Sequence, residues 1–269
     1  MTTTLLRRST RILVVNPNSS VAMTHGVEEA ISSMDLADST EIYTYTAPAD
    51  SPASINDGDD VIASAEVVFK NLTSSGVLQQ YDAVLVACFS VHPLVERLAE
   101  LQGSRGKLAV TGIFEASVLA SLSLLTTPPL NTVPARKWGI VTTGKFWEAH
   151  LTQGVNTFLG CDPRSANDKF AGVESTGLDA GDFHGGVDPA VIREKLKEAT
   201  KRLLGHGAVE CVVMGCAGMA GLDSIIRSAA IEKYGPEQGN QVLIVDGVRA
   251  GVGLLEQMVR NKRMFQKSS

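Results

Sequence analysis

The sequence predicts an α/β fold made of two similar halves, each a small parallel sheet flanked by helices. Short apolar runs alternate with helical patterns along the chain, and strands buried between two layers of helices carry such continuous runs. Two of the runs, Leu85–Cys88 and Val212–Cys216, end in a cysteine that precedes a helical pattern. With 269 residues, 44% of them hydrophobic, the chain can form one large domain or two smaller ones.

The first half reads as four strand–helix units. Asn18 or Ser19 is the expected N-cap of the first helix, and Pro93 stands at the favoured first position of the third. The expected elements are, in order, strand Arg11–Val15, a helix to Met34, strand Glu41–Thr46, the polar loop Asp50–Asp60, a helix with Val61, Ala65, Val68 and Leu72 on one face, strand Asp82–Ala87, helix Pro93–Leu101, strand Lys107–Thr111 and helix Phe114–Leu125.

The second half follows a loop, Thr126–Arg136, that contains three prolines and is a candidate boundary. Asp188 and Pro189 form an N-cap and first-turn pair that opens an amphipathic helix. The expected elements are strand Lys137–Val141, a helix to Phe158, strand Phe170–Glu174, the glycine-rich loop Ser175–Val187, a helix with Ile192, Leu196, Ala199 and Leu203 on one stripe, strand Val209–Gly215, helix Met219–Tyr234, strand Gln241–Val245 and helix Gly247–Arg263.

An internal repeat relates the two halves. The strand exits at Asn16 and Cys88 lie 72 residues apart, and those at Thr142 and Cys216 lie 74 residues apart. Ligands of open parallel sheets bind beyond the carboxyl ends of the strands, where all four residues are expected. If the halves face one another, both cysteines reach one cleft. Eight βα units in a chain of this length also fit a TIM barrel, so periodicity leaves that fold open.

Composition excludes several classes of protein. The net charge of −5 argues against nucleic acid or an anionic membrane as a partner, since both require a basic face. No apolar run approaches the roughly 20 residues of a membrane span. The four cysteines form neither a disulfide framework nor a CxxC zinc motif. Met1–Arg11 lacks the apolar core of a signal peptide, so we expect a cytoplasmic protein, with a short mitochondrial presequence as the alternative.

The two cysteine settings predict acid–base chemistry. A helix N-terminus favours the thiolate and can lower a cysteine pKa from about 8.5 into the range of about 3.5–7.5. Two thiols on opposite sides of a carbon suit 1,1-proton transfer, in which one removes a proton and the other returns one from the opposite face. Backbone N–H groups within Phe89–Val91 and Ala217–Met219 would stabilise the enolate oxygen. This scheme needs no metal, flavin or pyridoxal phosphate.

Three motifs carry a resemblance to a known family: N-P-N-S-S-x-x-M-T at Asn16–Thr24, A-C-F-S-x-H-P-L at Ala87–Leu94, and M-G-C-A-G-M at Met214–Met219. Together they resemble the hydantoin/allantoin racemase branch of the aspartate/glutamate racemase superfamily. The first cysteine motif is especially similar to that of the fungal, Dcg1-like members. The resemblance extends from Arg11 to about Arg260.

The resemblance implies two pseudo-symmetric Rossmann-like domains, residues 1–112 with 225–269 and residues 113–224, and an active site between them. It implies a cofactor-independent, homo-oligomeric racemase of 5-substituted hydantoins, with allantoin as the best single guess. Cys88 and Cys216 match the catalytic cysteines. The matched substrate-binding positions are Asn16, Phe89, Ser90, Thr142, Thr143, Ala217 and Gly218.

The residues that follow the cysteines point to a neutral cyclic ureide as substrate. In amino-acid racemases of the superfamily, Asn-Thr follows the first cysteine and Thr-His the second. Phe89-Ser90 and Ala217-Gly218 occupy those places here, so groups that would bind an α-amino acid are missing.

Other residues and functions offer alternatives to this interpretation. Cys161 and Cys211 are expected to be packing residues. His92 either touches the first thiol or shapes its turn, and His184 either covers the cleft or lies on the surface. A related decarboxylase or cis–trans isomerase of a carboxylate is the second hypothesis, although the decarboxylases use one cysteine. A non-catalytic small-molecule sensor is the third.

Overall fold

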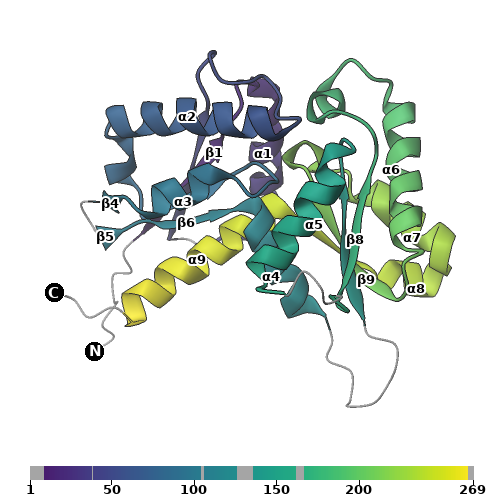
Figure 1. Cartoon of the computed structure of the whole chain (residues 1–269). Helices are drawn as coiled ribbons and strands as arrows, with labels where there is room; N and C mark the ends of the chain where they lie inside the picture. The colour runs from purple at the N-terminus through teal and green to yellow at the C-terminus, as the bar shows by residue number, and fades with distance from the viewer. Residues whose placement is uncertain (1–8, 38, 104–105, 126–135, 162–166, 266–269) are drawn as a thin grey trace.

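A computed structural model describes residues 9–37, 39–103, 106–125, 136–161 and 167–265, without the side chains of 102–107. Two four-stranded parallel sheets lie side by side (Figure 1). The first has the order β2-β1-β3-β6, from Thr40–Thr46, Thr10–Asn16, Ala83–Val86 and Ala109–Gly112. The second has the order β8-β7-β9-β10, from Phe170–Ser175, Lys137–Thr142, Val209–Gly215 and Leu243–Asp246. The α/β architecture of two similar halves is confirmed, and two separate sheets exclude a TIM barrel.

Helices cover both faces of each sheet. The outer face of the first sheet packs against α2 (Gly58–Ser74) and α3 (Pro93–Ala99), and that of the second against α6 (Pro189–Leu203) and α7 (Asp223–Tyr234). The inner faces share one hydrophobic core with α1 (Val21–Ser32), α4 (Ile113–Leu124), α5 (Phe146–Phe158) and α9 (Gly247–Phe265). This common core fixes the two halves against each other.

The last helix of each half crosses to the other half. Helix α4 follows β6 of the first sheet but packs on β9 and β10, whereas α9 follows β10 and packs on β1, β3 and β6. The predicted boundary assigned residues 225–269 to the first domain. Strand pairing corrects this assignment, because β10 is hydrogen-bonded to β9 and α7 packs on α6. The chain therefore returns to the first sheet at α9, not at residue 225.

Several element boundaries differ from the sequence expectation for local reasons. Ser20, not Asn18 or Ser19, caps α1, because its hydroxyl accepts the N–H of Met23. The expected helix from Met219 is a 3₁₀ turn, η3, at Ala217–Met219, and α7 begins only at Asp223. The remaining elements were not predicted: η1 at Val77–Gln80, the hairpin strands β4 (Gln102–Gly103) and β5 (Gly106–Lys107), η2 at Ala180–His184 and α8 at Pro236–Gln241.

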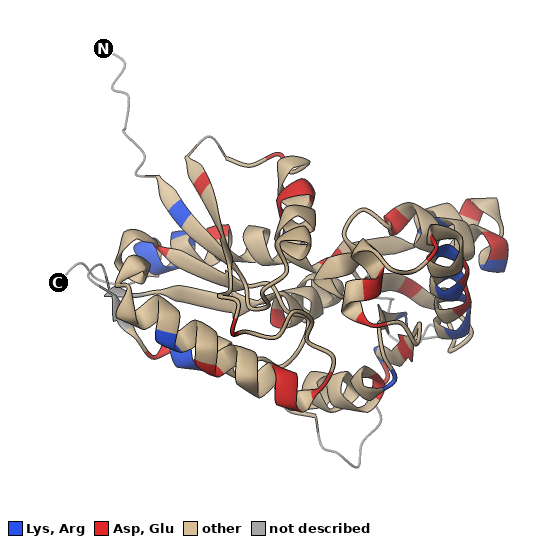
Figure 2. Ribbon diagram, turned by 90° about the horizontal axis from the view of Figure 1, so that it is seen from above, with Lys and Arg blue, Asp and Glu red and all other residues tan. Residues whose placement is uncertain are grey.

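The outer helices carry acidic and basic residues side by side (Figure 2). Lys197 and Lys201 on α6 form ion pairs with Glu232 on α7. Alternating charges along α6 are typical of a helix face that is exposed to solvent. Among the described residues, no helix combines the length and the apolar character that crossing a membrane would require.

Candidate active site

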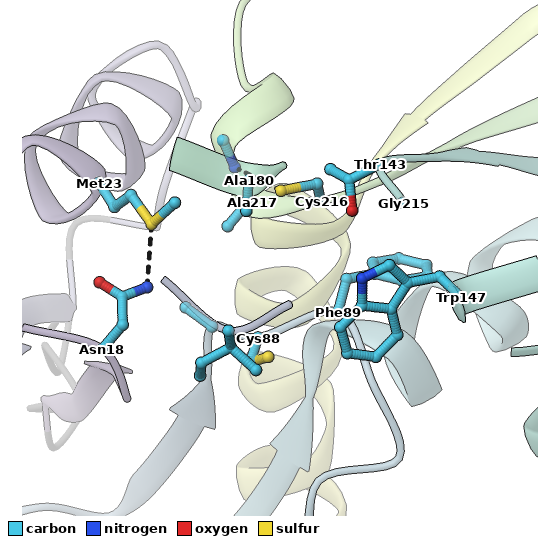
Figure 3. Close-up of a pocket in the computed structure, with 13 residues that line it drawn as sticks. Asn18, Met23, Cys88, Phe89, Thr143, Trp147, Ala180, Gly215, Cys216 and Ala217 are labelled. Atoms are coloured by element: carbon cyan, nitrogen blue, oxygen red, sulfur yellow. Dashed lines mark hydrogen bonds between the residues drawn. The ribbon is translucent and has the colours of Figure 1, made fainter. Parts of the chain in front are cut away.

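A pocket lies where the carboxyl ends of the two sheets meet, and both expected cysteines contribute to it (Figure 3). It encloses about 390 Å³ of empty space, part of it open to solvent. The lining residues come from both halves: Asn18, Met23, Ile55, Ala87, Cys88, Phe89, Thr143, Trp147, Ala180, Gly215, Cys216, Ala217 and Gly218. None of these side chains is charged, so the pocket suits a neutral ligand.

Cys88 and Cys216 approach the pocket from opposite sides (Figure 3). Cys88 follows β3, and its Sγ lies 3.4 Å from the Oγ of Ser90. Cys216 follows β9, and its Sγ accepts the N–H of Gly218 at 3.3 Å. The repeat thus places the two thiols at matching strand ends, as the sequence predicted, while their catalytic role stays a prediction.

Burial controls the ionisation of both thiols. It raises the pKa of Cys88 to about 12, although the Ser90 hydroxyl lowers it, and the proximity of Cys216 and Glu115 raises it further. Burial also raises the pKa of Cys216 to about 11, against the lowering effect of the N–H groups of Gly218 and Met219. The expected depression of these pKa values is therefore wrong.

The reason is the position of the helices. A helix N-terminus acts mainly within its first turn. Helix α3 begins at Pro93, five residues after Cys88, and the turn after Cys216 has only three residues. Neither element offsets the loss of water around a buried thiol.

His92 has a structural role at the start of α3. It caps α3, because its Nδ1 accepts the N–H of Leu94 at 3.3 Å, and its Nε2 lies 3.1 Å from the Oγ of Ser64. With Nδ1 as an acceptor, the neutral ring carries its proton on Nε2 and donates to Ser64. Burial lowers the pKa of His92 to about 4, in keeping with a neutral ring. Both ring nitrogens are thus bound away from the thiol.

Asn18, not Asn16, lines the pocket. The Asn16 side chain is buried and donates to Asn18, Ser20 and Thr24. Its Oδ1 accepts the N–H of Asn18, so the amide holds the loop that shapes this wall. Asn18 in turn donates from Nδ2 to the sulfur of Met23 at 2.9 Å.

The two threonines at the end of β7, Thr142 and Thr143, differ in the same way. The hydroxyl of Thr142 donates to the carbonyl of Gly215 at 2.8 Å, which ties β7 to β9. Thr143 lines the pocket, and its hydroxyl points into the space between Cys216 and Trp147 (Figure 3). Thr143 is therefore available to a ligand, and Thr142 is not.

The chain resembles known proteins over most of its length. The family model described as Asp/Glu/Hydantoin racemase matches residues 12–255. The chain belongs to this family. It is similar to hydantoin racemase from Pseudomonas sp. (strain NS671), with 30% identity over 250 residues that cover 93% of this chain and 86% of the relative. Protein DCG1 of Saccharomyces cerevisiae is 28% identical over 93% of this chain and 97% of that protein.

A solved structure supports the same assignment. Allantoin racemase from Klebsiella pneumoniae aligns with a TM-score of 0.72 and 26% identity, covering 94% of this chain and 88% of that one. The chain is therefore a racemase, which is an isomerase that acts at a stereogenic carbon.

Four further positions complete the site of this racemase. Phe89, Ala217 and Gly218 line the pocket, whereas Ser90 is fully buried behind it, with its Oγ 3.4 Å from the Sγ of Cys88. The N–H groups of Ser90 and Gly218 were expected to face a substrate. In the structure the N–H of Ser90 donates to the carbonyl of Cys88, and that of Gly218 donates to the sulfur of Cys216. Burial lowers the pKa of His184, which packs against Gly218 and Gly26 at the edge of the pocket.

Sequence reasoning missed the apolar walls of the racemase pocket. Ile55 is 5% exposed and lies in the loop that was predicted only as polar, where a single apolar residue was the available signal. Trp147 stands in the first turn after the strand exit at Thr143. Met23 on α1 and Ala180 on η2 gave no local signal, because the packing of the halves brings them to the pocket. Within the described residues, His, Cys, Asp and Glu form no cluster of three that could bind a metal ion.

Proposed function

We propose that this racemase interconverts the enantiomers of 5-substituted hydantoins, with allantoin as the first substrate to test. The single observation that carries the proposal is the placement of Cys88 and Cys216 at matching strand ends on opposite sides of one uncharged pocket. The names of the hydantoin and allantoin racemases that the chain resembles support the substrate class.

The proposed reaction is a proton exchange at C5 of the ring. One cysteine, as thiolate, takes the C5 proton, and the electron pair of the C–H bond moves toward the neighbouring carbonyl oxygen. The other cysteine, as thiol, donates its proton to C5 from the opposite face. The carbon thus inverts, and the two sulfurs exchange their protonation states.

The pocket walls fit a planar, neutral ring. Met23, Ile55, Phe89 and Trp147 supply apolar surface, and Asn18 and Thr143 supply polar groups that orient a ring amide or carbonyl. A substrate that carries a carboxylate would bring a negative charge into the pocket, and no lining residue supplies a positive charge to offset it. This disfavours aspartate, glutamate, malonate and maleate as substrates.

The test follows single enantiomers of allantoin and of an alkyl-substituted hydantoin in D₂O, with and without enzyme. We expect loss of optical activity together with entry of deuterium at C5, above the uncatalysed background. Cys88→Ser and Cys216→Ser should each lower racemisation by at least about 10²-fold, the range expected for loss of a positioned acid or base. Cys161→Ser is the matched control, because that thiol lies outside the pocket.

Two results would overturn the proposal. Racemisation that persists at the wild-type rate in either pocket variant would remove the two-cysteine reaction. Absence of exchange with every hydantoin, with turnover of a malonate or maleate instead, would replace the substrate class.

A further inference from the structure

Glu115 is a buried carboxyl group beside the first cysteine that the proposed reaction does not use. It lies in the first turn of α4, directly after β6. Gly112 at the end of β6 pairs with Val86, which stands two residues before Cys88. The carboxyl is close enough to Cys88 to act electrostatically on its thiol. Glu115 and Cys88 therefore occupy neighbouring strand exits of one sheet.

The carboxyl group is held without full hydrogen bonding. Oε2 of Glu115 is buried and has no hydrogen-bond partner among the described residues. Gly112 leaves the space that the group fills, because a Cβ at this position would lie 2.4 Å from Oε2 and 3.2 Å from Cγ2 of Val95. N–H groups of Gly112 and Glu115 compensate the burial only in part, and the pKa of the carboxyl is raised to about 7. A helix cap alone would not require such burial.

The strand end that corresponds to Gly112, beside the second cysteine, carries a different residue, Asp246. Asp246 at the end of β10 pairs with Met214, which stands two residues before Cys216. Its Oδ1 accepts the N–H groups of Val248 and Arg249, so this carboxylate caps α9. The counterpart of Glu115 in the repeat is Arg249, whose guanidinium donates to α1.

The two thiols consequently face opposite electrostatic surroundings. Cys216 receives N–H groups from Gly218 and Met219, which favour a thiolate. Cys88 has one hydroxyl partner and faces the carboxyl of Glu115 as well as the other thiol. Within the part of the chain that the structure describes, these are the titratable groups that influence Cys88.

Two basic side chains lie on neighbouring helices. Arg97 on α3 forms an ion pair with Glu66. His150 on α5 lies against the rings of Phe146 and Trp147, and its Nε2 is buried without a hydrogen-bond partner among the described residues. Burial lowers the pKa of His150, which favours a neutral ring.

We propose that Glu115 is a positioning residue whose buried carboxylate keeps the proton on Cys88 and leaves Cys216 to carry the negative charge. The assignment rests on the proposed two-cysteine reaction and adds a direction to it. Cys216 is then the thiol that ionises first and acts as the base, and Cys88 is the acid. Inversion of C5 leaves a thiol at Cys216 and a thiolate at Cys88, and the proton then returns from Cys216 to Cys88 through water, so charge is conserved over the cycle.

The test measures thiol alkylation by iodoacetamide between pH 6 and 10 in the absence of substrate, resolved by mass spectrometry of the cysteine peptides. Iodoacetamide reacts with the thiolate, so its rate reports ionisation. In the wild type Cys216 should react faster than Cys88. Glu115→Gln should raise the rate at Cys88 about three- to tenfold at a given pH, the effect of removing one nearby like charge. Asp246→Asn, the matched control, should leave the Cys88 rate unchanged.

The wild type supplies a second measurement that does not depend on the folding of a variant. Glu115 ionises near pH 7, and its new negative charge disfavours the Cys88 thiolate in the same pH range. The log10 of the alkylation rate should therefore rise by less than one per pH unit at Cys88, while it rises by one per pH unit at Cys216. A Cys88 profile that is unchanged in folded Glu115→Gln, or a slope of one at Cys88 in the wild type, overturns the role of Glu115. Because no turnover is involved, a failure of racemisation would be seen separately in the exchange experiment.

Discussion

Burial of the two pocket thiols makes the stability of the folded chain depend on pH in the alkaline range. Folding raises the pKa of Cys216 from 9.0 to about 11 and that of Cys88 from 9.0 to about 12. Between these values the unfolded chain has lost the thiol protons and the folded chain has kept them. The contribution of the two thiols to the free energy of unfolding is therefore fully present below about pH 9. It is lost as the pH rises toward 11 or 12.

The size of the loss follows from the pKa differences. Each thiol should cost roughly 1 to 1.4 kcal/mol between pH 8 and pH 10, so the pair should cost about 2–3 kcal/mol. Other buried groups also titrate here, since burial raises the pKa of Cys211 to about 11. The comparison is therefore between the wild type and the double variant Cys88→Ser with Cys216→Ser, which lacks only the two pocket thiols.

Urea unfolding at pH 8 and pH 10, followed by the fluorescence of Trp138 and Trp147, gives the required free energies. We expect the wild type to lose about 2–3 kcal/mol more than the double variant between these pH values. An equal loss in both proteins would refute the reasoning, because it would mean that the thiols ionise in the folded protein as easily as in the unfolded chain.

Three further predictions concern residues around the pocket. Thr142→Val should lower the free energy of unfolding by about 1–3 kcal/mol, because a buried β9 carbonyl loses its donor, and urea unfolding measures this. Gly218→Ala should lower kcat/KM at least about tenfold, since the new Cβ would lie 3.1 Å from Nε2 of His184, whereas Gly253→Ala, which has open space, should not. Burial lowers the pKa of His92 to about 4, so the stability that the neutral ring contributes is fully present above about pH 6.5 and is lost as the pH falls toward 4. Between pH 6.5 and pH 4.5, urea unfolding should therefore show the wild type losing about 2–3 kcal/mol more than His92→Gln.

The sequence was sufficient to predict the strands and the meeting of the two cysteines for one reason. Strands buried on both faces leave continuous apolar runs, and parallel strands present their exits at one edge. The repeat of Asn16 with Cys88 and of Thr142 with Cys216 then required only that the halves face each other. The strand orders of the two sheets confirm the repeat, because β1 and β3 are neighbours in the first sheet as β7 and β9 are in the second.

Side-chain direction and ionisation could not be read in the same way. Asn16 and Thr142 stand at strand exits, but their side chains are hydrogen-bonded to neighbouring segments. Asn18, two residues after Asn16, and Thr143, directly after Thr142, line the pocket instead. The helix N-termini predicted acidic thiols, yet burial raises the pKa of both thiols. Residues that line the pocket with them, such as Ile55 and Trp147, come from distant parts of the chain. Local patterns thus locate a residue, whereas its partners depend on the packing of both halves.

The two matched halves have a consequence for the proposed reaction. A racemase must process both mirror images, and exchanging the enantiomers exchanges the acid and the base. The two halves have the same strand order, so their backbones place Cys88 and Cys216 in equivalent positions. Either cysteine can therefore reach the carbon as acid or as base. The side chains break the equivalence, because Glu115 adjoins only Cys88 and two N–H groups serve only Cys216. On the proposed mechanism, one enantiomer therefore meets the resting enzyme with its base already in place, and the other needs the proton to move between the sulfurs first. The opening of the pocket to solvent gives water the access that this return of the proton requires.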